Sequence, residues 1–131
     1  MVMVSRDKIK VKGIKRLKNS FKYAIEGLIY AFKYEQNITI HFIATILVIL
    51  FSIILKISLL EWIIIILMIG LVIATELINT SIEAIVDLST NEINPLAKIA
   101  KDTAAAAVLV FAITSIIIAG IIFIPKILSI I

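Results

Sequence analysis

Four polar side chains recur at helical spacing inside an otherwise apolar stretch. They are separated by three, four and four residues: Glu76, Asn79, Glu83 and Asp87. In an α-helix this spacing places them along one stripe, with Thr80 beside them. A carboxylate can act as a general base, and one or two carboxylates together with substrate phosphates can hold Mg²⁺. The stripe therefore predicts base or metal chemistry, although an ion pair at a helix end or in the loop explains Asp87 better than catalysis does.

The composition places this stripe in a membrane. The chain has 131 residues, of which 62% are hydrophobic, and a mean hydropathy of +1.17, whereas soluble domains are about 45–50% apolar. A carboxylate inside a bilayer costs about 2.5–3.5 kcal/mol on insertion scales, so it normally faces a partner or a polar cavity. The absence of cysteine and the single histidine exclude thiolate catalysis and a histidine metal cluster, and four glycines leave no glycine-rich phosphate loop.

Three apolar runs are each long enough to cross a bilayer as a helix of roughly 20 residues. They predict an all-α integral membrane protein, a single membrane domain over residues 1–131, with spans at 38–57, 62–86 and 103–124. A polar loop at 87–102 separates the second span from the third, and the segment 1–34 precedes the first.

Charge predicts the orientation of these spans. Nine of the 13 Lys and Arg residues fall within residues 1–33, so the positive-inside rule places the N-terminus and the 87–102 loop in the cytoplasm and the C-terminus outside. In the segment 1–34, a cytoplasmic arm leads into apolar residues at helical spacing, with lysines over the remaining surface. This pattern predicts an amphipathic helix on the inner membrane face, and anchoring to anionic lipid is a sufficient explanation for it.

Depth separates the roles of the carboxylates. Glu76 lies about 21 Å along the helix from Trp62, and Glu83 lies about two turns further, near the cytoplasmic interface. Glu35, where the surface helix meets the first span, lies at a similar level. Glu35 and Glu83 are therefore plausible metal ligands and Glu76 a candidate base, although a solvated helix-end charge also explains Glu35.

The start of the third span carries a second polar group. Lys101 is explained either by reaching phosphates or by extending its amine to the membrane interface, and Asp102 is otherwise explained as the N-cap of the third span. The alanine run 104–107 predicts close helix packing. His41 has no second histidine with which to complete a metal site.

Residues 76–87, which read ELINTSIEAIVD, resemble the signature of the prokaryotic diacylglycerol kinase family. Ala100-Lys101-Asp102 with the following alanines is similar to that family's second hallmark, and the resemblance covers nearly the whole chain. It implies a homotrimeric enzyme of the bacterial cell membrane that phosphorylates lipid alcohols with MgATP and binds no nucleic acid.

The resemblance also implies roles for individual residues. Glu76 would be the general base, assisted by Asn79, and Glu35 and Glu83 would bind Mg²⁺. Arg16 and Glu76 would contact the lipid substrate. The residues that would contact ATP are Arg16, Tyr23, Glu35, Glu83, Glu92, Ile93, Asn94, Lys101 and Asp102. His41 stands where some relatives carry an acid.

Four functions are weighed against this pattern: a kinase acting on undecaprenol, a kinase acting on diacylglycerol, a transporter and a membrane scaffold. The lysine- and isoleucine-rich chain with its long basic arm looks more like the family branch that phosphorylates undecaprenol than the branch that phosphorylates diacylglycerol. A small proton-coupled transporter also uses an intramembrane glutamate. However, the outer half of the second span, residues 62–74, carries no charge, which disfavours polar access from both sides. A membrane scaffold peptide would leave the acidic stripe unexplained.

Overall fold

The computed structural model describes residues 12–131, and every regular element in that part of the chain is an α-helix. The four helices are α1 (Ile14–Tyr34), α2 (Gln36–Ile54), α3 (Leu59–Ser89) and α4 (Pro95–Leu128). The expectation of an all-α chain is confirmed over the described range. The basic residues Arg6, Lys8 and Lys10 of the expected cytoplasmic arm lie outside the described residues.

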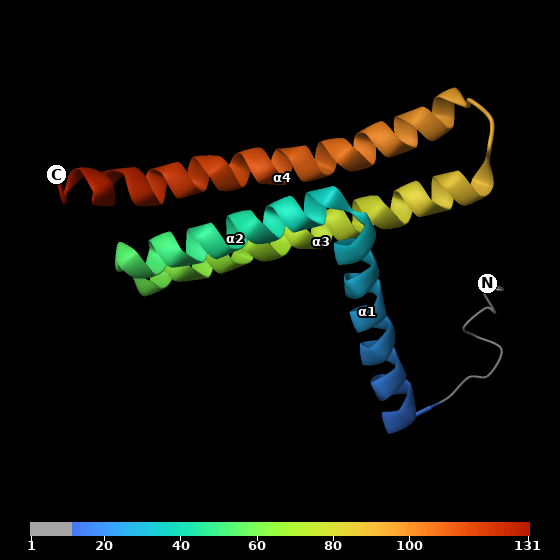
Figure 1. The fold of residues 1–131 in the computed structure, drawn as a ribbon, viewed down its shortest axis with the longest axis horizontal. Coiled ribbons are helices and arrows are strands. Elements are labelled where there is room, and N and C mark those ends of the chain that lie inside the picture. The colour runs from blue at the N-terminus through green and yellow to red at the C-terminus, as the bar shows by residue number, and fades with distance from the viewer. Residues whose placement is uncertain (1–11) are drawn as a thin grey trace.

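Helices α2, α3 and α4 run alongside one another, and α1 leads away across their direction (Figure 1). Each of these three is long and apolar enough to cross a membrane, as the sequence predicts. Most of their side chains are left uncovered within the single chain, which suits helices whose outer faces meet lipid tails. Beyond the α1–α2 junction, α3 and α4 continue as a pair to their connecting turn (Figure 1).

The most extensive packing in the chain joins α3 to α4. Ala104 and Val108, one turn apart on α4, are both buried, so the small side chain at 104 sits in a helix contact as expected. The other alanines of the run, at 105–107, are exposed. Since successive residues of a helix point in different directions, only one member of a short run faces a given neighbour.

Both ends of the α3–α4 pair are held by side chains. At the beginning of α3 the Ser58 hydroxyl accepts a hydrogen bond from the Glu61 N–H (3.3 Å), and the Glu61 carboxylate accepts one from the Ser58 N–H (2.6 Å). This is a capping box, which satisfies two otherwise unpaired donors. Glu61 also forms an ion pair with Lys126 near the end of α4 (3.1 Å). The buried cluster Ile57, Ile65 and Ile122, on which Trp62 packs, lies at this same end.

At the opposite end, the polar segment expected as a loop at 87–102 is mostly helical. Helix α3 continues to Ser89, and α4 begins at Pro95. Asn94 is the N-cap of α4, since its Oδ1 accepts a hydrogen bond from the Leu96 N–H (2.9 Å), and proline is favoured at the first helical position because it has no N–H to satisfy. The expected N-cap role of Asp102 is therefore wrong, because this residue already lies inside α4.

Glu35 separates α1 from α2, as predicted. Its backbone N–H donates to the carbonyl of Ala31 (2.8 Å), and its own extended conformation ends α1 and begins α2. Ala31 and Ile38, on the two sides of the junction, are both almost fully buried. Both α1 and α2, which meet at this junction, also contact α3, the helix that carries the acidic stripe.

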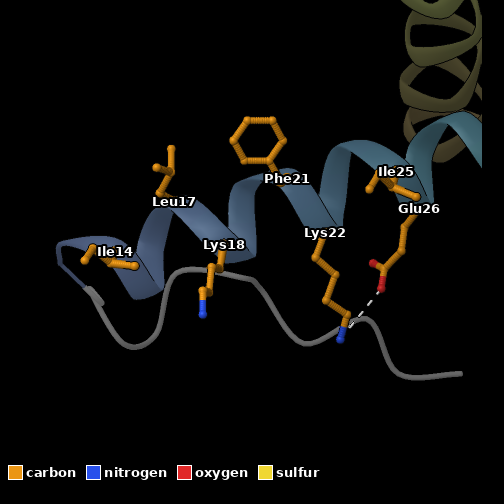
Figure 2. Close-up of a pocket in the computed structure, with 7 residues that line it drawn as sticks. All are labelled: Ile14, Leu17, Lys18, Phe21, Lys22, Ile25 and Glu26. Carbon is orange, nitrogen blue, oxygen red and sulfur yellow. Dashed lines mark ion pairs between the residues drawn. The ribbon is translucent and has the colours of Figure 1, made fainter.

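Away from the junction, α1 is uncovered by the rest of the described chain. Leu17 and Phe21 project to one side of the helix and Lys18 and Lys22 to the other (Figure 2). Lys22 pairs with Glu26 one turn further on, at 3.9 Å. The apolar side chains are exposed, so their burial requires something outside the chain.

Candidate active site

The acidic stripe on α3 forms as the spacing predicts. Glu76 and Asn79 are 1% and 5% exposed, and Glu83 is half-buried. The Asn79 Nδ2 donates a hydrogen bond to the Glu83 Oε1 at 3.1 Å, which holds these two side chains on the same face. An uninterrupted helix over 59–89 gives this face a rigid support.

Three polar atoms of this face are buried with no hydrogen-bond partner among the residues that the structure describes: Glu76 Oε2, Asn79 Oδ1 and Thr80 Oγ1. Buried polar groups in proteins are nearly always hydrogen-bonded, and an unsatisfied one costs about 1–3 kcal/mol. The three belong to residues within about one helical turn of one another. Such a concentration is typical of a site that a polar ligand completes.

The donor set suits a hard divalent cation. Carboxylate and amide oxygens are the ligands that Mg²⁺ takes in proteins, usually one or two carboxylates with the remainder supplied by phosphates and water. Glu35 and Glu83 are both half-buried, and Asn79 Oδ1 has no partner. Within residues 12–131 no three Asp, Glu, His or Cys side chains converge. The available oxygens therefore fit a cation shared with a phosphate-bearing ligand.

Charged side chains from α3 and α4 meet beyond the buried part of the stripe. Lys101 on α4 forms an ion pair with Asp87 on α3 at 2.5 Å and also lies within electrostatic reach of Glu83. The structure thus places an ammonium group next to the Asp87 end of the stripe, and Asp87 is an ion-pair partner as anticipated. An incoming phosphate would compete with Asp87 for Lys101. Asp102 pairs with Lys98, one turn earlier on α4.

The other predicted nucleotide contacts are more dispersed. Glu92, Ile93 and Asn94 are exposed in the short turn between α3 and α4. Tyr23 is half-buried on α1, whereas Arg16 is exposed in the first turn of α1. Arg16 is about 28 Å along α1 from Glu35, at 1.5 Å per residue. Within one chain the structure does not bring Arg16 to the acidic stripe. His41 is half-buried on α2.

Two features near the site were not anticipated. The Lys98–Asp102 pair follows the i, i+4 rule for helix ion pairs, so the spacing would have predicted it had residues 95–102 been recognised as helical. Asn94 and Pro95 lie within the segment expected as a loop, although asparagine followed by proline is also typical of an N-cap and first helical residue.

Comparison with known proteins bears on the function of this site. The family model described as prokaryotic diacylglycerol kinase matches residues 22–123. An undecaprenol kinase of Bacillus subtilis (strain 168) is 43% identical over 113 residues, covering 86% of this chain and 92% of that protein. A diacylglycerol kinase of Synechocystis sp. is 40% identical over 111 residues, covering 84% of this chain and 63% of that protein. A diacylglycerol kinase of Helicobacter pylori (strain ATCC 700392 / 26695) is 42% identical over 102 residues, covering 77% of this chain and 79% of that protein.

Proposed function

This chain belongs to the prokaryotic diacylglycerol kinase family, and on that premise we propose that it transfers the γ-phosphoryl group of ATP to the hydroxyl of undecaprenol. It is an ATP-dependent lipid kinase and a multi-pass membrane protein. The single observation that carries the choice of undecaprenol is the 43% identity to an undecaprenol kinase across 92% of that protein.

Diacylglycerol is the alternative substrate, and phosphatidic acid would then be the product. It is favoured by the relatives named diacylglycerol kinase, which are 40–42% identical to this chain. Family membership decides against the proton-coupled transporter and the scaffold peptide, because neither would phosphorylate a lipid with ATP, as members of this family do.

Glu76 is the general base of the proposed reaction. The lipid oxygen attacks the γ-phosphorus, and the bond from that phosphorus to the β,γ-bridging oxygen breaks, so that ADP leaves with the electron pair. The proton of the lipid hydroxyl passes to the Glu76 carboxylate. This role is supported by the burial of the Glu76 carboxylate, which is nearly complete, and by its Oε2, which has no hydrogen-bond partner in the described part of the chain. A general base of this kind contributes about 10²–10⁴-fold to the rate.

The charged groups around Glu76 bind the nucleotide. Glu35 and Glu83 would hold Mg²⁺, which when bound neutralises the charge on the ATP phosphates. Lys101 attracts the phosphates, and Asn79 orients the Glu83 carboxylate through its 3.1 Å hydrogen bond. Asp102, Tyr23 and residues 92–94 contact the rest of the nucleotide.

Assembly and orientation complete the proposal. The enzyme is a homotrimer with its N-terminus in the cytoplasm and its C-terminus outside, and α1 lies on the inner membrane surface with Leu17 and Phe21 towards the lipid. Arg16 contacts ATP and the lipid substrate. Its distance along α1 from Glu35 supports an arrangement in which it serves a neighbouring copy. The mass of the detergent-solubilised protein tests the trimer against the chain mass of 14.5 kDa.

The decisive experiment is phosphate transfer from labelled ATP by the purified protein with Mg²⁺ in mixed micelles. Undecaprenol and diacylglycerol are offered separately at matched mole fractions. We expect a higher kcat/KM for undecaprenol. A preference for diacylglycerol would retain the mechanism and change the substrate, and failure of a folded sample to phosphorylate either lipid would contradict the proposed function.

A further inference from the structure

Thr80 differs from the other hydroxyl-bearing residues buried or half-buried in these helices. Hydroxyls within a helix normally donate to the carbonyl four residues earlier. Among the other buried or half-buried serines and threonines of the described helices, this bond is made by Thr45, Ser52, Thr75, Thr114 and Ser115. Four exposed residues make it too: Ser20, Ser81, Ser89 and Thr103. The Thr80 hydroxyl does not bond to the carbonyl of Glu76, and its oxygen is buried without a hydrogen-bond partner among residues 12–131.

From this we infer that the Thr80 hydroxyl donates a hydrogen bond to a non-bridging oxygen of the phosphoryl group that is being transferred. The inference rests on the proposed kinase function and adds to it a phosphoryl-binding residue on α3. Thr80 would thereby join Glu76 and Asn79, the two other residues whose buried oxygens lack partners.

The position of Thr80 along α3 indicates which part of the substrates it meets. It lies four residues after Glu76, the proposed base, and three residues before Glu83, the proposed metal ligand. The transferred phosphorus must pass between the lipid oxygen at Glu76 and the nucleotide held near Glu83. A hydroxyl between these two levels is therefore placed beside the phosphoryl group and not beside the lipid chain or the adenine.

The chemistry of the transfer suits a hydroxyl donor at this point. While the bond from the lipid oxygen to the γ-phosphorus forms and the bond to the β,γ-bridging oxygen breaks, negative charge is spread over the three non-bridging oxygens. A buried, already oriented donor stabilises this charge more strongly than water does. Thr80 keeps its own proton, and the proton released by the lipid hydroxyl goes to Glu76.

The test compares Thr80→Val, which keeps the shape of the side chain without its hydroxyl, with Thr80→Ser, which keeps the hydroxyl. If valine at this position impairs folding, the comparison of Thr80→Ala with Thr80→Ser still measures the effect of the hydroxyl on the rate. Thr75→Val on the same helix is the matched control, because the Thr75 hydroxyl is already bonded to the Leu71 carbonyl (2.5 Å). Each variant is purified, its assembly checked by gel filtration, and its kcat and KM measured for ATP and for the lipid. Slow hydrolysis of ATP without lipid is measured in parallel.

We expect Thr80→Val and Thr80→Ala to lower kcat by about 10- to 100-fold, with smaller changes in KM. Slow ATP hydrolysis should fall in parallel, because water and the lipid receive the same phosphoryl group. Thr80→Ser should retain most of the rate, and Thr75→Val should match the unaltered enzyme.

Three results would overturn the inference: an unchanged kcat in both hydroxyl-free variants, a loss confined to lipid transfer with ATP hydrolysis intact, or a loss shared by Thr80→Ser and accompanied by failed assembly. The first excludes a role for the hydroxyl, the second assigns it to the lipid, and the third assigns it to packing. Absence of lipid transfer by the unaltered enzyme would instead contradict the proposed function itself.

Discussion

The proposed chemistry depends on a few polar side chains of α3, of which Glu76 and Asn79 are buried by the rest of the chain. Glu76 is 1% exposed and its Oε2 has no partner. The neighbouring Asn79 uses its amide N–H to hold Glu83, which leaves its own oxygen free of partners. Buried groups left in this state reduce stability, so their concentration on one face of α3 is most simply explained by the substrates that satisfy them.

Glu76→Gln keeps the size of the side chain but removes its ability to accept the proton of the lipid hydroxyl. We expect kcat to fall by about 10²–10⁴-fold, the range lost with a general base, while gel filtration shows an unchanged assembly. Glu26→Gln, on the exposed part of α1, is the matched control and should retain the rate. A nearly normal rate for Glu76→Gln would show that another group takes the proton.

Glu83→Gln keeps an oxygen that can accept the Asn79 hydrogen bond but removes the charge that attracts Mg²⁺. We expect the Mg²⁺ concentration that gives half-maximal rate to rise by about tenfold or more, since altered metal sites typically lose 10–100-fold in affinity. The measurement is the initial rate against free Mg²⁺ at fixed ATP. A reduced rate with an unchanged half-maximal Mg²⁺ concentration would show that Glu83 is not a ligand of the metal.

At the scale of elements, α3 and α4 work as a pair fastened at both ends. One end has the Ser58–Glu61 capping box and the Glu61–Lys126 ion pair. The other end has the Asp87–Lys101 ion pair. The proposed site lies towards the second end, so the first end can be altered to test stability separately from catalysis.

Ser58→Ala removes the side-chain cap of α3, which should lower the free energy of unfolding by about 1 kcal/mol. Kinase activity at a temperature well below the transition should be unchanged, because Ser58 lies at the end of α3 opposite to the acidic stripe. The free energy is measured by denaturant titration in detergent. Ser89→Ala, whose hydroxyl already bonds to the Ile85 carbonyl, is the control, and an equal loss in both variants would contradict a specific capping contribution.

At the scale of the whole molecule, the three apolar helices and α1 leave large apolar surfaces that this chain alone does not cover. The faces of α2, α3 and α4 need lipid or other copies of the chain to cover them, and the Leu17 and Phe21 side of α1 is similarly exposed. By the positive-inside rule, the concentration of Lys and Arg within residues 1–33 predicts that this exposed helix lies on the cytoplasmic side.

The orientation can be tested with single cysteines, because the sequence contains none of its own. In cells that express Lys12→Cys or Ser129→Cys, a membrane-impermeant maleimide should label position 129 in intact cells and position 12 only after lysis. Active protein from both variants is the control for correct insertion. The reverse labelling pattern would show that the topology is opposite to the expected one and that the proposed site faces the outside.

Much of the architecture was predictable because it depends on local properties of the chain. Apolar runs of bilayer length predict spanning helices, and helical periodicity alone places Glu76, Asn79 and Glu83 on one stripe. The same rules predict Glu35 at the junction of two helices. These features need no knowledge of which helix packs against which.

Only the tertiary structure decided which side chains are buried and what they meet. The helical register does not reveal that the Thr80 hydroxyl lacks the usual bond to the carbonyl four residues earlier. It also does not show that Ala104 alone of its run is buried, or that Lys101 forms an ion pair with Asp87 on another helix. The physical reason is that periodicity specifies neighbours along one helix, whereas contacts between helices depend on how distant segments pack. The sequence therefore determined the stripe and the membrane class, and packing decided which of its polar atoms are left for a substrate.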